Sequence, residues 1–595
     1  RVDRKYPGPS TAAIVNAAEA RGIPAIRLLD DGNLVQLGYG AAMRRIWTAE
    51  TDQTSAIAET ISRDKDLTKT LLSSCGVPIP EGREVASPDD AWDAAEDIGL
   101  PVCVKPTDGN HGRGVFIDLN TKEEVAKAYS IAVNEGSGVL VERSIRGAEH
   151  RLLVIGGKLI AANRSDMITV TGEGKSTVLE LIDSQINIDP RRGSTEQHPL
   201  SIIRIDAAAR MELERQKLSP DEVPAAGREV LIQRNANHAF DCTDEVHPDT
   251  AELASLAARI VGLDIAGIDL VCLDISKPLS EQGGAIVEVN AGPSLLMHIK
   301  PGIGKARPVG QAIVNNLFAE GLRGRVPLVG VTGTHGKTAV AKLIAHLIYM
   351  SGQHAGLACS DGIFLGRRQV QKTDAANWAG GRRLLLNRAV EAAVVENGAR
   401  VILGEGLPYD RCSVGVVTNI VAEDEDLSRW DVQPTGGEYY TTHRSIYRTQ
   451  VDVVLSSGHA VLNAGDSLVA EFAELCDGEV IFYAADPACP ALAEHLAAGK
   501  RGVYVSEGRI TLGTGTEEIR LCRLGDVPVI GKQKDPATIA NVLAAIAAGW
   551  AMDLSQEVIA TGVKTFGLEL PDPVALLPQR ARKSLPAKKP AAVRN

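Results

Sequence analysis

The chain of 595 residues has few aromatic side chains, no excess of positive charge and no long apolar run. Phe, Trp and Tyr make up 4% of its residues, and its formal net charge is −12. Binding to a nucleic-acid backbone needs a basic face, so the acidic total argues against general nucleic-acid binding. No apolar run approaches the roughly 18 residues that a membrane-spanning helix needs, and no segment has the pattern of a signal peptide.

The nine cysteines are scattered along the chain, and no Cys-x-x-Cys pair occurs among them. Several lie in apolar runs, as in Val102-Cys103-Val104. This usage predicts buried free thiols and a cytoplasmic location. The chain opens on Arg1 rather than on methionine, and we expect upstream sequence to be missing.

Short Val/Ile-rich strands alternate with Ala/Leu-rich helical patterns, which predicts a multidomain protein of α/β and α+β class. At 63.0 kDa the chain is too long for one core. We expect a boundary near residue 325, where a fresh strand, loop and helix begin. Residues 571–595 hold five prolines, six Lys or Arg and one acid, a composition typical of a disordered tail.

Two short apolar segments each carry acid or amide side chains. They are AGIDLVCLD (Ala266 to Asp274) and AIVEVNAGP (Ala285 to Pro293). Residues two apart in a strand share a face. Glu288 and Asn290 therefore point one way, whereas Val287 and Val289 turn to the other face. If the two strands are neighbours, Asp269 joins Glu288 and Asn290 in a cluster of oxygen donors, which Mg²⁺ prefers.

A further strand, Val102 to Pro106, carries Lys105 near its end and is followed by a glycine-rich loop, residues 109–114. Glycine lets the backbone approach phosphate oxygens closely, and an ammonium just before such a loop can meet the same oxygens. The loop residues of interest are Gly109, His111, Gly112 and Gly114. We expect the loop to close as a lid, with His111 shaping it.

Downstream, VERS and HRLLVIGGKLIAANRS read as a strand followed by a hairpin whose turn is Gly156-Gly157. Arg151 and Arg164 project from this hairpin. Taken alone, each is interpreted as a surface charge.

In order, these segments resemble the ATP-grasp ligases, and the longer strings are similar to the cyanophycin synthetase family over about residues 7–570. The strings that carry this resemblance are GPSTAAIV, RLLDDGNLVQLGYG, KPTDGNHGRGV, CTDEVHP, GLDIAGIDLV and VEVNAGPSLLMH. Cyanophycin is a polymer with a poly-aspartate backbone and arginine on each β-carboxylate. In this family the ATP-grasp domain phosphorylates the C-terminal carboxylate of the growing polymer and joins the incoming amino group to it.

The resemblance implies a site residue by residue, with ATP and Mg²⁺ as cofactors. Lys65 and Lys105 would hold ATP phosphates, and Glu142 would sit at the nucleoside end. Arg151 and Arg164 would face the γ-phosphate and the acyl phosphate, so that with Lys105 they form the implied catalytic set. The implied metal ligands are Asp269, Glu288 and Asn290.

The second half begins with VPLVGVTGTHGKT, which resembles the phosphate loop of Mur-type peptide ligases. There Gly333, Gly336, Lys337 and Thr338 would bind nucleotide. In the family this domain adds arginine to the aspartate side chain.

Other motifs of that second site are eroded. The metal-type Glu396 survives, but its Arg-Gly-Gly register does not, and the segment Val421 to Leu427 lacks a histidine. The lysine that Mur ligases carbamylate falls on Tyr447. We expect the C-terminal lobe of the family to be missing. The pattern resembles the truncated second type of the family, which polymerises β-aspartyl-arginine dipeptides at one site.

The domains implied are an ATP-grasp domain at 1–325 with an inserted lobe at about 166–245, an inactive Mur-like central domain at 326–570, and the tail at 571–595. The implied partners are the polymer or a primer and the dipeptide, with no nucleic acid and no membrane, in a homo-oligomer.

Three alternatives stay open. A two-site synthetase would use free aspartate and arginine. A ligase of the glutathione-synthetase sort would share the first half but not the second. A non-catalytic scaffold paralogue would bind the polymer without turnover.

Overall fold

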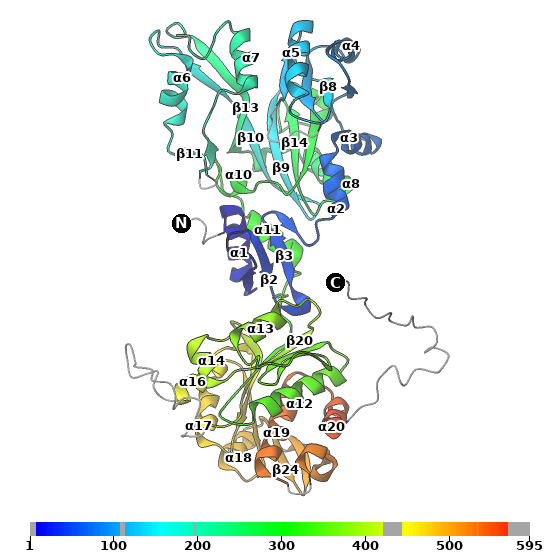
Figure 1. Cartoon of the computed structure of the whole chain (residues 1–595), viewed down its shortest axis with the longest axis vertical. Coiled ribbons are helices and arrows are strands. Elements are labelled where there is room, and N and C mark those ends of the chain that lie inside the picture. The colour runs from blue at the N-terminus through cyan, green and yellow to red at the C-terminus, as the bar shows by residue number, and fades with distance from the viewer. Residues whose placement is uncertain (1–6, 108–113, 196–197, 421–442, 532–533, 569–595) are drawn as a thin grey trace, which may run out of the picture. The chain divides into compact units, whose positions relative to one another are not determined.

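The computed structural model describes residues 7–107, 114–195, 198–420, 443–531 and 534–568 (Figure 1). The chain divides into two compact units. Unit 1 comprises Arg1–Gly38 and Arg44–Gly324, and unit 2 comprises Tyr39–Met43 and Arg325–Asn595. The short segment Tyr39–Met43 therefore groups with the second half of the chain, which the sequence did not indicate. The multidomain α/β and α+β class expected from the sequence is confirmed.

The largest sheet of unit 1 carries most of the candidate residues, and we call it the site sheet. Its strand order within the described residues is β13-β10-β9-β14-β15, all antiparallel. Its strands are β9 (Ala148–Ile155), β10 (Lys158–Thr171), β13 (Glu229–Asp241), β14 (Ile265–Cys272) and β15 (Ala285–Ala291). The predicted hairpin is confirmed, because β9 and β10 pair across Gly156 and Gly157, whose φ angles of 56° and 72° only glycine adopts readily.

Helices cover both faces of the site sheet. One face packs against α8 (Pro248–Val261) in a buried cluster that includes Leu152, Ile268 and Ala258. The other face packs, at one end of its strands, against α1 (Pro9–Ala20) and α11 (Val309–Leu317). Because these two helices cover only that end, the rest of the face is left for polar residues.

A smaller sheet of unit 1 carries Lys105, and we call it the cover sheet. Its strand order is β5-β8-β6-β7. The strands are β5 (Gly82–Val85), β6 (Val102–Pro106), β7 (Phe116–Leu119) and β8 (Val139–Arg143). One hydrophobic core forms between the cover sheet and the helices α4 (Pro88–Ile98) and α5 (Lys122–Ala132). Ala91, Ala95 and Ala128 of these helices are fully buried in it. A capping box at Thr121 and Glu124 fixes the start of α5.

The remaining elements of unit 1 form three smaller groups. The N-terminal strands β1 (Ala25–Arg27), β2 (Leu34–Leu37), β3 (Arg44–Trp47) and β4 (Glu50–Thr51) pair in that order. They are followed by α2 (Ala56–Arg63) and α3 (Lys65–Ser74). Between β10 and β13 lie α6 (Val178–Leu181), a π-helical turn (Ile182–Asn187), β11 (Arg192–Gly193), β12 (Leu200–Ser201) and α7 (Ala207–Arg215). Flanking β15 are α9 (Leu279–Gln282) and α10 (Leu296–Ile299).

Unit 2 is built on one sheet whose described strands follow the order β19-β18-β17-β20-β16-β21-β22-β23-β24-β25-β26. The six neighbouring pairs among β17, β20, β16, β21, β22, β23 and β24 are parallel. At one edge β18 and β19 pair antiparallel, and at the other edge β25 and β26 do so. The strands are β16 (Leu328–Thr332), β17 (Ala355–Cys359), β18 (Gly362–Leu365), β19 (Arg368–Gln371), β20 (Ala392–Glu396), β21 (Cys412–Val417), β22 (Val454–Asn463), β23 (Glu479–Ala484), β24 (Arg501–Ser506), β25 (Arg509–Thr514) and β26 (Glu517–Arg523).

Helices of unit 2 complete its α/β architecture. They are α12 (Lys337–Met350), α13 (Trp378–Leu385), α14 (Ala399–Gly404), α16 (His443–Asp452), α17 (Ser467–Ala470), α18 (Pro490–Ala497), α19 (Pro536–Ala551) and α20 (Gln556–Thr565). The alanine-rich α19 is buried from Val542 to Gly549 and packs with α12 over the parallel strands. Near-continuous apolar strands are what a sheet covered on both faces requires.

The described residues bear on the expectations for membrane helices and for cysteines. None of the described helices combines the length and apolar character that crossing a bilayer requires. All nine cysteines are free thiols, and six of them are buried. Cys75 is exposed, so the expectation of burial does not hold for this residue. The tail at 571–595 lies outside the described residues.

Candidate active site

The predicted oxygen donors of β14 and β15 lie together on one face of the site sheet. Asp269 is the cross-strand partner of Glu288, so the two strands are neighbours, as the sequence analysis required. The Asn290 amide donates from Nδ2 to Asp269 Oδ2 over 3.1 Å. Within the described residues no three His, Cys, Asp or Glu side chains gather as a metal centre. A cation here would therefore depend on two carboxylates and an amide, a donor set that fits Mg²⁺.

The simple alternation predicted for β15 is interrupted by a bulge. Asp269 pairs with Glu288, but the next residue, Leu270, pairs with Ile286. Val287 is the extra residue and is only partly buried, whereas Ile286 and Val289 enter the core. The prediction that Val287 turns inward with Val289 is therefore wrong at this position, because a bulge resets the alternation of side chains.

Arg151 of β9 lies beside Asp269 on the other side from Glu288. The two are cross-strand partners and form an ion pair through Nε and Nη2, with Nη2 2.9 Å from Oδ2. Burial raises the pKa of Asp269 to about 8, although the Arg151 charge opposes the rise. An added divalent cation would favour the ionised carboxylate in the same way that Arg151 does.

Glu149 was not singled out from the sequence. It precedes Arg151 by two positions in β9 and so shares its face. Burial raises the pKa of Glu149, with the Arg151 charge opposing and the Glu288 charge adding to the rise. The same two-residue spacing that joined Glu288 to Asn290 was the signal that could have found it.

Lys65 opens α3 and reaches toward the cation site. Its Nζ lies 3.6 Å from Glu288 Oε1. The helix begins here because Asp64 caps it, accepting a hydrogen bond from Leu67 N over 3.0 Å. A small hollow between α3 and β15 is lined by Ser62 of α2 and by Lys65, Thr68, Lys69, Leu72, Ile286, Val287, Glu288 and Val289.

Glu142 of the cover sheet is buried between two lysines. Its Oε2 lies 2.8 Å from Lys105 Nζ, and its Oε1 contacts Lys69 Nζ. Burial lowers the pKa of both lysines, and for Lys69 the neighbouring Lys105 charge adds to the fall, to about 6. Glu142 thus supplies the charge that lets these cations sit side by side. Lys69 was missed from the sequence, although it stands four residues after Lys65 on the same helical face.

The glycine-rich loop is described only at its end. Gly109, His111 and Gly112 lie outside the described residues. Gly114 has a φ of 69°, and a Cβ added there would lie 3.2 Å from the Cβ of Glu135. Both the positive φ and this close approach explain why glycine occupies the position where the chain enters β7.

Arg164 is not brought to the site. Its cross-strand partner is His150, whereas the partner of Arg151 is Asn163. Since paired residues of antiparallel strands share a face, Arg164 lies on the face covered by α8, opposite to Arg151. Its guanidinium lies 5.3 Å from the centre of the Phe240 ring. The expectation that Arg164 faces the γ-phosphate alongside Arg151 does not agree with this register.

The phosphate-loop residues of unit 2 are brought together between β16 and α12. Gly333 and Gly336 have φ angles of 128° and 82°. Lys337 Nζ donates to Thr334 O over 2.9 Å, and Thr338 Oγ1 donates to Glu396 Oε1 over 3.0 Å. This is the local geometry expected of a loop that wraps a phosphate.

The surviving glutamate of unit 2 is enclosed by hydrogen bonds. Glu396 is 2% exposed and accepts from Ser360 N and Ser360 Oγ, each over 2.9 Å, besides Thr338. Tyr447, at the position of the carbamylated lysine, is 1% exposed in an apolar cluster with Val417 and Phe472. The segment Val421 to Leu427 lies outside the described residues.

Two buried histidines of unit 1 predict a loss of stability in acid. Burial lowers the pKa of His150 to about 4 and that of His298 to about 3. Below pH 6.5 the unfolded chain binds a proton that the folded chain refuses until its own lower pKa. The free energy of unfolding therefore decreases as the pH is lowered below 6.5, by about 2 kcal/mol for each histidine between neutral pH and pH 5.

The measurement is urea unfolding at pH 8 and pH 5. His298→Gln should reduce the difference between the two free energies of unfolding by about 2 kcal/mol. The matched control is His354→Gln, which changes an exposed histidine and should leave the difference as in the parent. An unchanged difference in His298→Gln contradicts the prediction.

Part of unit 1 is similar to known proteins. Residues 64–180 match the family described as carbamoyl-phosphate synthase L chain, ATP binding domain. A glutathione biosynthesis bifunctional protein of Clostridium perfringens is 31% identical over 322 residues, which are 52% of this chain and 41% of that protein. The crystal structure of a bifunctional glutathione synthetase from Pasteurella multocida aligns with a TM-score of 0.39 at 29% identity, over 53% of this chain and 44% of that one.

Similarity to other known proteins extends through both units. A cyanophycin synthetase of Geminocystis herdmanii is 38% identical over 567 residues, which are 94% of this chain and 64% of that protein. The chain thus spans less than two thirds of the length of this relative. Over almost all of its own length, the chain is similar in sequence to the cyanophycin synthetases.

Proposed function

We propose that unit 1 is an ATP-dependent ligase of cyanophycin synthesis, which activates the terminal carboxylate of the polymer as an acyl phosphate and joins an amino group to it. The observation that supports this most is the grouping of Asp269, Glu288 and Asn290 with the ion pair of Arg151. In the proposal these residues hold Mg²⁺, while Lys65, Lys69 and Lys105 bind phosphate oxygens.

The chemistry asks two anions to meet, because a carboxylate attacks a phosphoryl group. Bound ATP supplies the phosphoryl group, and Mg²⁺ screens its charge. The lysine ammonium groups would neutralise the phosphates, and Arg151 would stabilise the negative charge that develops on the carbonyl oxygen when the amine adds to the carboxyl carbon. Arg164 is left out of this set because it lies on the opposite face of the site sheet. Glu142 stays at the nucleoside end, as the resemblance implies.

We propose further that the substrate is β-aspartyl-arginine dipeptide and that unit 2 is a Mur-like domain without activity. The apolar surroundings of Tyr447 support this, because the second metal ligand set is then incomplete. A two-substrate synthetase is the alternative, favoured by the retained contact of Thr338 with Glu396. Homo-oligomeric assembly and a cytoplasmic location stay predictions from the sequence.

A substrate panel tests the proposal. The purified chain is given ATP, Mg²⁺ and a short cyanophycin primer, together with either dipeptide or free aspartate and arginine, and ADP release is measured. We expect ADP release in the series that contains the dipeptide and none in the series that contains free aspartate and arginine. Turnover that requires both free amino acids would favour the two-substrate alternative, and no turnover with any substrate would favour the scaffold.

Lys337→Met tests whether the phosphate loop of unit 2 takes part. We expect the rate of dipeptide ligation to stay within about twofold of the parent, since the proposal gives Lys337 no role in the site of unit 1. The matched change in unit 1 is Lys105→Met, which should abolish ligation by removing a phosphate-binding cation. Equal losses in the two variants would mean that both sites are needed.

A further inference from the structure

A row of polar side chains crosses the site sheet, one from each strand at the same register. In strand order the row is Glu288, Asp269, Arg151, Asn163 and Asp241. Cross-strand partners share a face, so the row is continuous on the side where the cation site lies. Its first three members have roles in the proposed function, whereas Asn163 and Asp241 have none.

The chain that follows the metal ligands runs across the same face, and we call Gly292–Arg307 the cross-sheet segment. It leaves β15 directly after Asn290 and Ala291. A Cβ added at Gly267 of β14 would lie 2.8 Å from the Cβ of Pro293. Leu295 is fully buried in a cluster that includes residues of β9 and β10. The segment therefore passes from one edge of the sheet toward the other, alongside the row.

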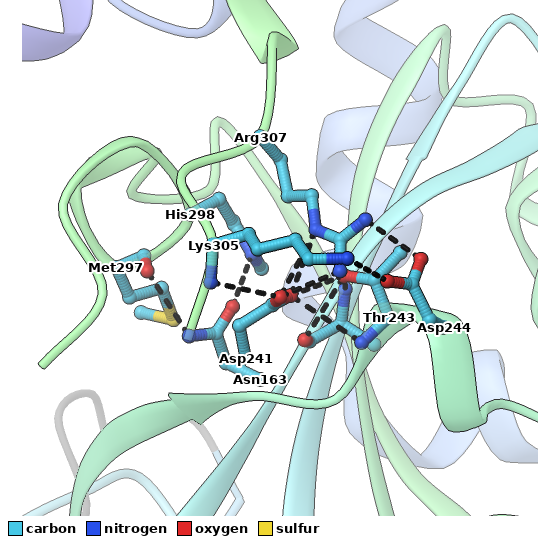
Figure 2. Close-up of polar contacts among 9 residues, drawn as sticks. Asn163, Asp241, Thr243, Asp244, Met297, His298, Lys305 and Arg307 are labelled. Atoms are coloured by element: carbon cyan, nitrogen blue, oxygen red, sulfur yellow. Dashed lines mark hydrogen bonds and ion pairs between the residues drawn. The ribbon is translucent and has the colours of Figure 1, made fainter. Parts of the chain in front are cut away.

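Asn163 ties the middle of the cross-sheet segment to the row (Figure 2). Its Nδ2 donates to Met297 O over 3.0 Å, and its Oδ1 lies 2.7 Å from His298 Nδ1. Because Oδ1 only accepts, the imidazole carries its proton on Nδ1. Asn163 and His298 are 0% and 1% exposed, so this connection is sealed from solvent.

Asp241 ties down the far end of the segment, as Figure 2 shows. Arg307 donates to it from Nε over 3.0 and 3.1 Å and from Nη2 over 2.6 Å. Lys305 N also donates to its carboxylate over 3.2 Å, and Asp241 N donates to Ile303 O over 2.9 Å. Arg307 reaches on to Asp244 from Nη1 over 2.8 Å. We call these contacts the clamp, because they hold the end of β13 against the cross-sheet segment.

The clamp is built for fixed geometry. The side chains of Asp241 and Arg307 are 4% and 15% exposed, whereas that of Asp244 is 59% exposed. Burial disfavours the Asp241 carboxylate, but hydrogen bonds from Arg307 and Thr243 outweigh it and lower its pKa. A planar guanidinium that meets a carboxylate through two nitrogens fixes orientation as well as distance. Lysine at the same place would keep the charge and lose the orientation.

We propose that Asp241 and Arg307 are positioning residues, which hold the cross-sheet segment as the wall of the subsite for the incoming amine substrate. The inference rests on the proposed function of unit 1. Cations and metal ligands gather at the Glu288 end of the row, where the phosphates belong. The amine must reach the activated carbon from a side that the phosphate groups leave free. The Asn163–Asp241 half of the row, with the segment anchored on it, is that side.

The test separates activation of the carboxylate from use of the amine. The chain is given ATP, Mg²⁺ and cyanophycin primer, with hydroxylamine as a small nucleophile in one series and β-aspartyl-arginine dipeptide in the other. Hydroxamate formation reports the acyl phosphate without using the amine subsite. Steady-state rates in the second series give KM for the dipeptide and kcat. Arg323→Met, an exposed arginine of unit 1, is the matched control.

Arg307→Met should raise KM for the dipeptide about tenfold or more, because small misplacements of a binding wall are costly. Hydroxamate formation should fall by less than about threefold. Arg307→Lys and Asp244→Asn keep part of the clamp, so each should fold and raise KM by a smaller factor.

Three outcomes would overturn the proposal. One is a KM for the dipeptide that is unchanged in Arg307→Lys and Asp244→Asn. The second is a loss of hydroxamate formation that parallels the loss of ligation, which would mean that the clamp supports the whole unit. The third is a parent chain that forms no hydroxamate, which overturns the proposed function and the assignment of the wall with it.

Discussion

Replacing Glu288 by glutamine is expected to lower dipeptide-dependent ADP release by about a hundredfold or more, since a metal ion contributes several kcal/mol of charge stabilisation to such transfers. The change removes one of two carboxylates from the donor set, with almost no change in shape. It also leaves the Lys65 ammonium, 3.6 Å away, without this carboxylate. The measurement is coupled-assay ADP release over a range of Mg²⁺ concentrations.

The control for this experiment is Glu252→Gln, which alters an exposed glutamate on α8 and should behave as the parent. A shift of the half-maximal Mg²⁺ concentration to higher values in Glu288→Gln would identify the loss as one of metal affinity. Parent-like rates at all Mg²⁺ concentrations would show that Glu288 holds no essential cation, and the ligase proposal would lose its main support.

Glu142→Gln is expected to destabilise unit 1 by about 3 kcal/mol or more in the absence of nucleotide, because it leaves buried ammonium groups without their counter-charge. Lys69 and Lys105 both contact this carboxylate. Phosphate groups would restore the missing negative charge. ATP with Mg²⁺ should therefore raise the melting temperature of the variant by more than it raises that of the parent.

Thermal unfolding with and without ATP and Mg²⁺ measures both effects. Glu84→Gln on the neighbouring strand β5 is the matched control, because it changes an exposed glutamate of the same sheet. An equal rise in melting temperature for the parent and Glu142→Gln would mean that the two lysines do not bind the phosphates.

Much of the fold was readable from local pattern. The turn at Gly156-Gly157 needed left-handed backbone, which glycine provides, and the hairpin formed there. The segments around Asp269 and Glu288 were recognisable as apolar strands that carry polar groups, whereas their pairing was only a condition in the sequence analysis and is met in the structure. The strand, loop and helix that carry Lys337 were likewise legible, because glycine spacing and helix periodicity are properties of neighbouring residues.

Other features depended on packing between distant segments. The sequence did not indicate that Val287 forms a bulge, because bulges arise from the register of two strands. Lys69 of α3 contacts Glu142 of the cover sheet, which lies more than 70 residues away along the chain. Arg164 was expected at the γ-phosphate with Arg151, but it lies on the opposite face of the site sheet. The face on which a hairpin arginine lies depends on its cross-strand partner, which the local sequence does not show.

The order of residues along this chain determined which groups can bind a cation, a phosphate or a carboxylate, since those capacities belong to the side chains themselves. Only the tertiary structure decided that Glu288, Asp269, Arg151, Asn163 and Asp241 form one row. Such a row needs five strands in a fixed register, and register is set by long-range pairing and core packing, which local sequence does not encode.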